Sequence, residues 1–372
     1  MKSNYKALSE LIEKVDERNA DGAITELIGV SIDKCFIKSV ANTNGTDLSK
    51  YKIIRKNEFA VSLMQVSRDS KIPIARLEDY DVAIMSPAYP IFRVKDTSVV
   101  LPEYLEMWFK RPEFDREAAF IAVGGVRGSM PWEEFAKMKL PVPPMDKQKN
   151  IVKAYKTITD RIALKQKIND NLLATTQAIY KSWFVDFEPF DNVCPSDWGN
   201  GCVDDIAEFY DSMRKPLSSL ERADMERIYP YYGAVSIVDY VDDFIFDGEY
   251  LLLSEDGIYV VDENGHPLLQ HITGKFWANN HAHILKGKSG FNEDSLYLFL
   301  ANTNMAPIVT GAAQPKINQA NLKSFPITIP TSEVIENFNA LIQPFFDQRL
   351  SNEAEVKKLE SLKDLLLSRL VN

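Results

Sequence analysis

Cysteine and histidine are scarce in this sequence, which has three Cys and four His among 372 residues. Cys35, Cys194 and Cys202 are odd in number and lack the spacing of metal ligands, so neither a disulfide framework nor a zinc site is indicated. His281 and His283 alternate as on a strand, which would suit a metal, but the sequence assigns them no carboxylate partner. We therefore expect no cofactor.

Motifs that bind nucleotides or methyl donors are missing as well. No glycine fingerprint for a dinucleotide or adenosylmethionine follows an expected strand, and there is no P-loop. The pair Pro143-Pro144 is followed by Met145, so it does not form the Asn/Asp-Pro-Pro-aromatic motif of amino-methyltransferases. No Ser-His-Asp triad can be placed. The sequence favours a binding protein over an enzyme.

Long apolar runs and a net basic charge are also absent. No run approaches the length of a membrane-spanning helix, and residues 1–5 carry no apolar signal region, so we expect a cytoplasmic protein without a membrane partner. Residues 1–186 contain 29 Lys and Arg against 25 Asp and Glu, whereas residues 187–372 contain 14 against 28. This distribution excludes a uniformly basic nucleic-acid binder and predicts two halves that differ in surface electrostatics.

The stretch from Pro143 to Val185 has the pattern of a long amphipathic helix. Proline fixes φ at its start, and Asp146 can cap the first turn. Forty residues of helix would be about 60 Å long, more than the width of a small domain, so this helix must run between two bodies or beside a second helix. The apolar residues recur at steps of three and four, as in a coiled-coil seam; they are Ile151, Ala154, Tyr155, Ile158, Ile162, Ile168, Leu172 and Ile179.

The same pattern returns at the end of the chain after a shift of 187 residues. The offset is about half the chain length, so the sequence predicts a tandem duplication in the order globular unit, helix, globular unit, helix. Within the globular units the offset drifts from 195 to 187, which indicates that their loops differ in length. Loops are the places where two copies of one scaffold make different contacts. Without a gap, the alignment pairs Gly124 with Gly311, Met130 with Ile317, Leu140 with Ile327, Pro143 with Pro330, Ile151 with Phe338 and Ile179 with Leu366.

The expected fold class is α+β, with two tandem-repeat globular α/β units. The expected domains are residues 1–145, a central long helix and linker over 146–190, a second unit over 191–331, and a C-terminal long helix over 332–372. The repeat predicts a pseudo-twofold molecule with antiparallel helices, because each helix must start from its own unit and reach the other.

Two local features of this organisation can also be predicted. Residues 1–12 are expected to form a short opening helix, with Leu8, Leu11 and Ile12 on one face. Pro344 lies inside the second long helix. An interior proline costs about 3 kcal/mol, so we expect a bend or a fresh helix start there.

Three stretches carry a resemblance to a known family: residues 140–148, residues 182–190, and the paired glycine loops 124–129 and 311–317. In these stretches, and across essentially the whole chain, the sequence resembles the DNA-specificity subunit of type I restriction–modification systems. The resemblance implies two target-recognition domains held apart by two antiparallel helices, each reading one half of a split double-stranded DNA site. It also implies docking of two modification (methyltransferase) subunits, with restriction (translocase and nuclease) subunits as further partners and no catalytic residue in this chain.

Candidate DNA contacts are polar, cationic and aromatic side chains between strands, because such side chains read base edges or hold phosphates. Arg127 and Lys316 stand out, since neighbouring glycines let the backbone approach a phosphate closely. For the others a structural role is at least as plausible: Trp277 and Tyr232 as core residues, and Asn280 as the cap of a turn. The candidates are Arg68, Lys71, Tyr89, Arg127 and Ser129 in the first unit, and Tyr231, Tyr232, Lys275, Trp277, Asn279, Asn280, His281, Gln314 and Lys316 in the second.

Two functions follow from different readings of the sequence. The first is a non-catalytic subunit that reads a bipartite DNA site and scaffolds modification and restriction subunits. The second is a protein-only scaffold that holds partner proteins on a helical spacer, and the acidic second half favours it. If DNA is bound, the first unit should supply more of the salt-dependent affinity, because cations make the phosphate contacts.

Overall fold

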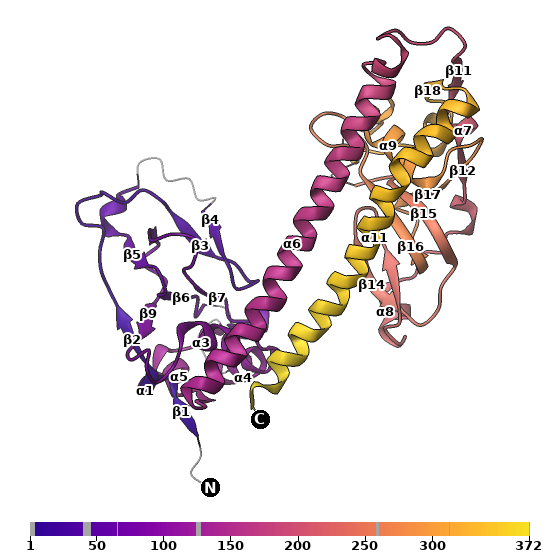
Figure 1. Cartoon of the computed structure of the whole chain (residues 1–372). Helices are drawn as coiled ribbons and strands as arrows, with labels where there is room; N and C mark the ends of the chain where they lie inside the picture. Colours follow the sequence, from indigo (N-terminus) through magenta and orange to yellow (C-terminus); the bar gives the residue numbers. More distant parts are fainter. Residues whose placement is uncertain are drawn as a thin grey trace. The chain divides into compact units, whose positions relative to one another are not determined.

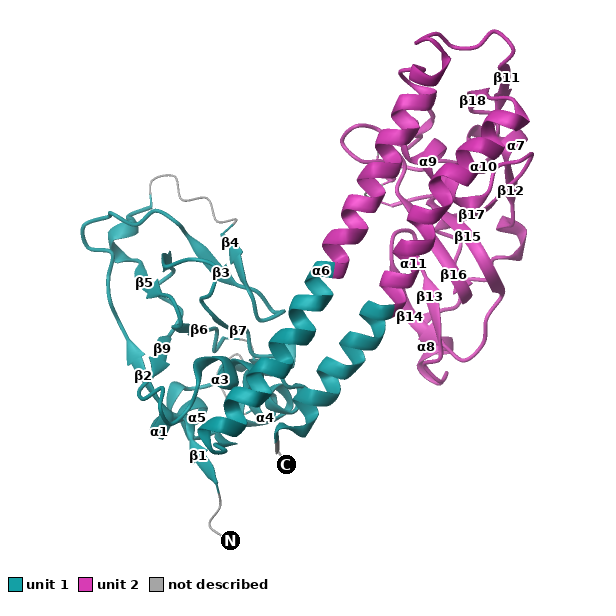
Figure 2. Cartoon of the chain, viewed as in Figure 1, with its two compact units in different colours: residues 1–164, 355–372 teal, residues 165–354 magenta. Residues whose placement is uncertain are grey.

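A computed structural model of the chain describes residues 4–39, 46–64, 66–123, 128–257, 260–311 and 313–371. The chain forms two compact units (Figure 2): unit 1, residues 1–164 and 355–372, and unit 2, residues 165–354. The two long helices, α6 (Met145–Phe184) and α11 (Ser332–Ser368), contribute to both units (Figure 1). None of the described helices is apolar over a stretch long enough to cross a membrane.

Helix α6 falls inside the stretch from Pro143 to Val185 that carries the predicted helical pattern. It has no Gly or Pro that would interrupt its hydrogen bonds. The buried amide of Gln148 fixes its first turn. The side-chain oxygen accepts a hydrogen bond from the N–H of Leu101 at 2.9 Å, and Nε2 donates to the carbonyls of Val99 (2.9 Å) and Pro143 (2.8 Å). The start of α6 is therefore tied to the segment that precedes α3 (Pro102–Phe109).

Within unit 2 the two helix segments run in opposite directions. Lys165 of α6 donates a hydrogen bond from Nζ to Oδ1 of Asn352 of α11 at 2.8 Å. Farther along α6, the ring of Trp183 lies 5.6 Å from that of Phe338. Residue numbers thus fall along α11 as they rise along α6, which is the relation of antiparallel helices.

Pro344 does not interrupt α11, which is helical without a break. The prediction of a fresh helix start at this proline was therefore wrong. Pro344 is on the exposed side of the helix, where the carbonyl of Ala340 loses its donor but can bond to water. Ile342 and Phe346 on the other side are buried in the core of unit 2, and this packing holds the helix together across the proline.

Unit 1 contains a four-stranded sheet of order β2–β9–β6–β7 with antiparallel neighbours, and its other strands form the pairs β1–β10, β3–β4 and β5–β8. One large core joins the sheet to α3, α4 and the long helices. The elements are β1 (Tyr5–Ala7), α1 (Leu8–Leu11), β2 (Ile12–Val15), β3 (Ile28–Val30), β4 (Phe36–Lys38), β5 (Lys52–Arg55), β6 (Phe59–Val61), α2 (Val66–Asp69), β7 (Ile74–Arg76), β8 (Val82–Met85), β9 (Ile91–Val94), α3, α4 (Pro112–Ala122), α5 (Trp132–Lys137) and β10 (Lys139–Pro141).

Unit 2 contains a six-stranded sheet of order β12–β17–β15–β16–β13–β14 and the pair β11–β18. Within the larger sheet, β13 and β16 are parallel and the other neighbours are antiparallel. The elements are β11 (Gly199–Cys202), α7 (Val203–Ile206), β12 (Ala207–Phe209), α8 (Ser219–Ala223), β13 (Tyr229–Tyr232), β14 (Ile237–Val241), β15 (Phe246–Ser254), β16 (Leu269–Ala278), β17 (Ala282–Gly287), α9 (Glu293–Ala301), α10 (Gln319–Lys323) and β18 (Pro326–Ile329).

The strand order repeats between the units. The pair β1–β10 corresponds to β11–β18, and the order β2–β9–β6–β7 corresponds to β12–β17–β15–β16. Unit 2 adds β13 and β14 at one edge of its sheet. The duplication that the 187-residue offset predicts is thus visible in the topology of each unit taken by itself.

The opening of each unit differs from the predicted helix. Residues 5–15 form β1, the single helical turn α1 and β2, and unit 2 opens in the same way with β11, α7 and β12. The helix predicted over residues 1–12 was therefore wrong in extent. Leu8, Leu11 and Ile12 are all buried, but the strands on either side of α1 pair with β10 and β9.

Two opposed glycines bend the β15–β16 hairpin. Phe246, at the start of β15, pairs with Phe276 of β16, and Ser254, at the end of β15, pairs with Ala282 of β17. A straight strand of that length spans about 26 Å, whereas the chain from Phe276 to Ala282 reaches at most about 21 Å. The strands must bend, and the cross-strand partners Gly248 and Gly274 have φ values of 126° and 88°, which glycine adopts without a Cβ clash. The bend brings the turn after β16 beside the end of β15.

Candidate nucleic-acid interface

In unit 1 the candidates Arg68 and Ser129 lie close together. Gly128, with φ of 73°, packs against the start of α2, where a Cβ would stand 2.4 Å from Oγ of Ser67. The positive φ and this close approach both favour glycine. Arg68 is exposed and pairs with Asp69 at 2.7 Å, a surface ion pair that costs little to break when a phosphate arrives.

The other three candidates of unit 1 have different surroundings. Lys71 follows α2 and is exposed. Tyr89 is half-buried against an apolar cluster of unit 1, and its carbonyl accepts a hydrogen bond from Nζ of Lys52 at 3.1 Å, so much of this residue serves the fold. Arg127 and the rest of residues 124–127 lie outside the described residues.

In unit 2 three connections meet at one edge: the turn after β15, the turn between β16 and β17, and the segment before α10. Backbone hydrogen bonds join them. The N–H of Glu255 donates to the carbonyl of His281 at 2.9 Å, and that of Gly257 donates to the carbonyl of Pro315 at 3.3 Å. This reading edge, as we call it, carries the candidates Asn279, Asn280, His281, Gln314 and Lys316.

The side chains of the β16–β17 turn divide into structural and projecting ones. Oδ1 of Asn279 accepts a hydrogen bond from the N–H of His281 at 2.9 Å, so the residue that caps the turn is Asn279. Nδ1 of His281 lies 2.6 Å from a carboxylate oxygen of Asp256. Asn280 is exposed, and its amide has no hydrogen bond to any described residue. An uncommitted, exposed amide is the group best suited to a base edge.

Lys316 is held by a carboxylate beneath the reading edge. Its Nζ lies 2.7 Å from Glu255, and Nη1 of Arg214 lies 2.5 Å from the same carboxyl group. Burial alone would raise the pKa of Glu255, but the hydrogen bonds from Lys316 and Arg214 outweigh it and lower that pKa. Lys316 therefore presents less free charge to a phosphate than its sequence context suggests.

Behind Glu255 lies a buried His–Asp pair that sequence reasoning missed. Nδ1 of His283 contacts Oδ2 of Asp211 at 2.6 Å, and Nε2 contacts the carbonyl of Ile317 at 2.8 Å. Asp211 also accepts hydrogen bonds from the N–H of Ile284 and from Gln319, each at 2.8 Å. His283 was noticed in the sequence, but its carboxylate partner stands 72 positions away, and only the fold brings the two together.

Two aromatic candidates belong to the core. Tyr231 is 2% exposed, and its hydroxyl accepts a hydrogen bond from the N–H of Leu217 at 2.9 Å. Trp277 is 7% exposed, and its Nε1 donates to the carbonyl of Lys215 at 2.6 Å. Both side chains are anchored inside unit 2, so we withdraw them as DNA contacts.

Tyr232 and Lys275 also pack on aromatic rings. Tyr232 is half-buried, with its ring edge-on to Phe276 at 5.7 Å between centroids. Lys275 is exposed, and its Nζ stands 4.3 Å from the centre of the Phe244 ring. A cation on an aromatic face stays accessible to an anion, so Lys275 keeps its place as a phosphate-contact candidate.

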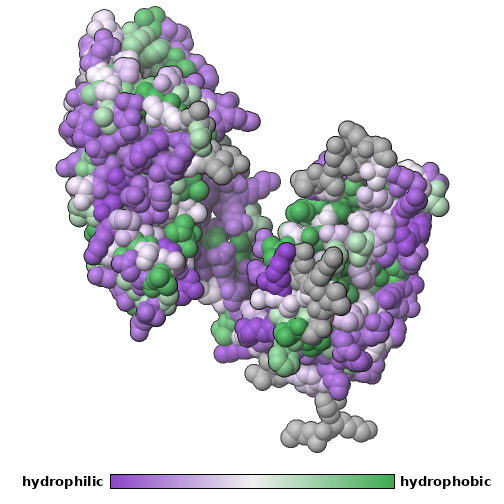
Figure 3. Space-filling model, turned by 180° about the vertical axis from the view of Figure 1, so that it is seen from behind, coloured by the Kyte–Doolittle hydropathy of each residue, from purple (hydrophilic) through white to green (hydrophobic). Residues whose placement is uncertain are grey.

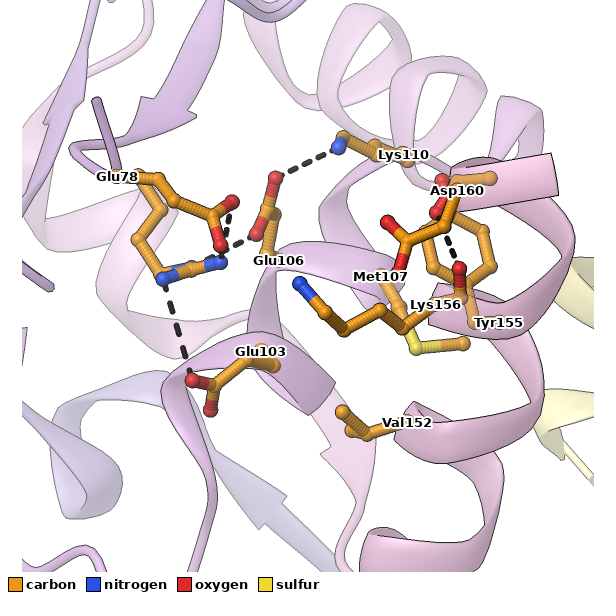
Figure 4. A pocket seen from close by; sticks show the side chains of 11 residues that line it. Glu78, Glu103, Glu106, Met107, Lys110, Val152, Tyr155, Lys156 and Asp160 are labelled. Carbon is orange, nitrogen blue, oxygen red and sulfur yellow. Dashed lines mark hydrogen bonds and ion pairs between the residues drawn. The ribbon is translucent and has the colours of Figure 1, made fainter. Parts of the chain in front are cut away.

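A charged pocket of about 170 Å³ in unit 1 lies between β7, α3 and α6 (Figure 4). Arg76 lies 2.7 Å from Glu106 and 3.1 Å from Glu78, and Lys110 lies 2.6 Å from the other oxygen of Glu106. These charges neutralise one another and link α3 to the sheet. The pocket has no nucleophile paired with a base, so it offers no catalytic arrangement.

Unit 2 also has an exposed apolar edge. Figure 3 shows hydrophobic atoms gathered at the lower end of this unit, the end at which Figure 1 labels β14 and α8. The edge strand β14 exposes Ile237, Val238 and Tyr240. Such an edge suits a protein partner better than a phosphate backbone.

The chain thus consists of two repeated α/β units, and exposed candidate residues lie in both of them. A family model described as the type I restriction modification DNA specificity domain matches residues 92–174 and 195–363. The chain belongs to this family.

Relatives in sequence agree with this assignment, and one solved structure shares the fold. A putative type I restriction enzyme specificity subunit of Haemophilus influenzae is 36% identical over 143 residues, covering 37% of this chain but only 36% of that protein. The MjaIX specificity subunit of Methanocaldococcus jannaschii is 23% identical and covers 73% of this chain and 68% of that one. The fold is similar to the type I restriction–modification S subunit from M. genitalium, with a TM-score of 0.58 and 13% identity over 99% of this chain and 96% of that chain.

Proposed function

We propose that this chain is the non-catalytic specificity subunit of a type I restriction–modification system and that it reads a bipartite double-stranded DNA target. The family match carries the proposal, because it falls on both repeats. In this proposal residues 1–145 and 191–331 are target-recognition domains, each reading one half-site. The helical segments 146–190 and 332–372 set the gap between the half-sites.

We further propose a pseudo-twofold relation between the repeats. Arg161 forms an ion pair with Glu355 in unit 1, and Lys165 contacts Asn352 in unit 2. Lys165 and Asn352 are themselves equivalent under the 187-residue offset. In an antiparallel pair of repeated helices, equivalent positions face each other only where a twofold axis crosses. The axis of our proposal therefore crosses at Lys165 and Asn352.

The candidate residues take different roles in this proposal. Arg68, Lys71 and Lys275 are exposed cations that would hold phosphates. Asn280 and Gln314 are exposed amides that would read bases at the reading edge. Two modification subunits would dock on the helices, and restriction subunits would join them. Methyl transfer and cleavage would occur in those partners.

The salt dependence of binding tests the anchoring role of Lys71. Replacing Lys71 with Ala should weaken binding to all duplexes and flatten the plot of log K against log salt by about one unit, because about one counterion fewer is released. Lys56→Ala is the matched control. Lys56 is also an exposed lysine, paired with Asp81, but it lies before the start of β6, whereas Lys71 lies beyond the end of that strand. Equal slopes for the two variants in the assembled complex would exclude the assignment of Lys71.

Methylome sequencing of the host tests the function itself. Loss of this chain should abolish methylation at one split motif and leave every other methylated motif intact. The competing function is a protein-only scaffold, which the exposed edge of β14 favours. An unchanged methylome after loss of the chain would support that scaffold instead.

A further inference from the structure

A second, partly buried cluster in unit 2 lies apart from the reading edge. It comprises Glu249 of β15, His271 of β16 and Asp294 in the first turn of α9, whose ligand atoms all lie within 4.8 Å of one another. Glu249 pairs with Thr273 across the hairpin, so His271 is its diagonal neighbour on the same face. The sequence did not single out these three residues as a site.

Glu249 orients the imidazole of His271. Its Oε1 lies 2.6 Å from Nε2, and this hydrogen bond is the main cause that lowers the pKa of Glu249. When Nε2–H of the neutral imidazole donates its hydrogen bond to this carboxylate, the lone pair of the ring stays on Nδ1. The ring also packs against Tyr297, stacked at 6.2 Å, and against Phe346 at 5.9 Å, and these two rings contact each other on the same side of the imidazole.

Nδ1 of His271 faces a carboxylate oxygen that lacks a partner. Asp294 is 2% exposed, and its Oδ1 has no hydrogen bond within the described part of the chain. A buried oxygen of this kind is costly unless something binds it.

The separation of these two atoms suits a shared metal ion. Nδ1 of His271 and Oδ1 of Asp294 are 3.6 Å apart, too far for a hydrogen bond. Two ligands at about 2.0–2.1 Å from one zinc ion stand about 3.3–3.6 Å apart when the angle between them is near tetrahedral or slightly wider. A carboxylate on the far nitrogen of the imidazole completes the carboxylate–histidine–metal arrangement found at many zinc sites.

The buried cluster of Asp211, Glu255 and His283 differs from this site in that its ligand atoms are already occupied. Both nitrogens of His283 already face acceptors, namely Asp211 and the carbonyl of Ile317. Glu255 is occupied by Arg214 and Lys316. No lone pair of this histidine is free, so proximity alone does not make that cluster a metal site.

We propose that unit 2 binds one divalent transition-metal ion of the Zn²⁺ type through Nδ1 of His271 and the carboxylate of Asp294, with Glu249 orienting the histidine. Water from the adjoining cavity of about 120 Å³ completes the coordination. The mixed nitrogen and oxygen donors favour Zn²⁺ over Mg²⁺ or Ca²⁺. The ion would clamp α9 onto the β15–β16 hairpin that carries the reading edge.

Metal titration of the full chain tests this site. After chelator treatment, calorimetry with ZnCl₂ should show one strong equivalent and a rise in Tm, whereas MgCl₂ should produce neither. Asp294→Asn and His271→Gln should abolish the strong equivalent, and Glu249→Gln should weaken it by about 10–100-fold. His266→Gln is the matched control, because His266 is paired only with Asp262 of its own turn among the described residues and should bind as the wild type does.

Cobalt spectra separate this site from the exposed cysteines. Co²⁺ should give visible d–d bands without a thiolate charge-transfer band, and Asp294→Asn should remove those bands while retaining the circular dichroism of the wild type. A wild type without a strong zinc equivalent would overturn the proposal. So would zinc binding that survives both ligand substitutions, or a thiolate band that accounts for all the bound cobalt.

Discussion

Replacing Glu106 with Gln is expected to destabilise α3 and the sheet of unit 1 by about 3–5 kcal/mol. Glu106 is shared by two cations, Arg76 at 2.7 Å and Lys110 at 2.6 Å, and the side chain of Arg76 is only 5% exposed. Loss of this carboxylate leaves the guanidinium buried with the more distant Glu103 and the exposed Glu78. Hydrogen exchange of the α3 amides in the full chain measures the opening free energy directly.

The matched control is Glu13→Gln. Glu13 also lies 2.7 Å from an arginine, Arg93, but both side chains are about half exposed, so the loss should stay below about 1 kcal/mol. If both variants lowered protection equally, the buried network would not hold α3 in place.

The loss of stability at acid pH provides a second measurement of the role of Glu106. Burial alone would raise the pKa of Glu106, but the charges of Lys110 and Arg76 outweigh it and hold that pKa below its ordinary value of 4.5. The stabilisation is therefore present above pH 4.5 and is lost as the pH falls through the lower folded-state pKa. Glu106→Gln should lack this component of acid destabilisation.

Replacing Asn280 with Ala should relax base preference at one position of one half-site by roughly 1–3 kcal/mol. Asn280 projects from the reading edge with an uncommitted amide, whereas the neighbouring Asn279 caps the turn. The salt slope should hardly change, because no phosphate contact is lost. The measurement is binding of the assembled complex to cognate duplexes and to duplexes changed at single positions.

Asn264→Ala serves as the control for this variant. Asn264 is an exposed asparagine in another turn of unit 2, where its backbone N–H donates to Asp262. It should leave base preference and affinity as they are. A loss of affinity that is uniform over all sequences in Asn280→Ala would assign Asn280 to phosphate contact and not to reading.

The long-range organisation of this chain could be predicted because its signal is redundant. Helix α6 repeats the same apolar spacing over 40 residues, so no single residue decides its bounds. The opening helix depended on three apolar residues, which the observed strand–turn–strand buries equally well. At Pro344 a local penalty was outweighed by the burial of Ile342 and Phe346, which the sequence does not quantify.

The candidate site was harder to predict, because residue type does not reveal direction. Trp277 and Lys275 are two residues apart on β16, yet the first is buried and the second is exposed. The glycines that bend β15 and β16 lie 26 positions apart in the sequence but directly opposite each other in the sheet. The metal-binding candidates His271 and Asp294 likewise come from a strand and a helix that only the fold brings together.

Selection of bound duplexes from a random-sequence library tests the central claim most directly. The chain would be assembled with its modification subunit, and the bound DNA would be sequenced over several rounds. Our account predicts two fixed half-sites separated by a constant gap of unspecified sequence, because each repeat reads one half and the helices fix their distance. Enrichment of one contiguous site, or no enrichment at all, would contradict it.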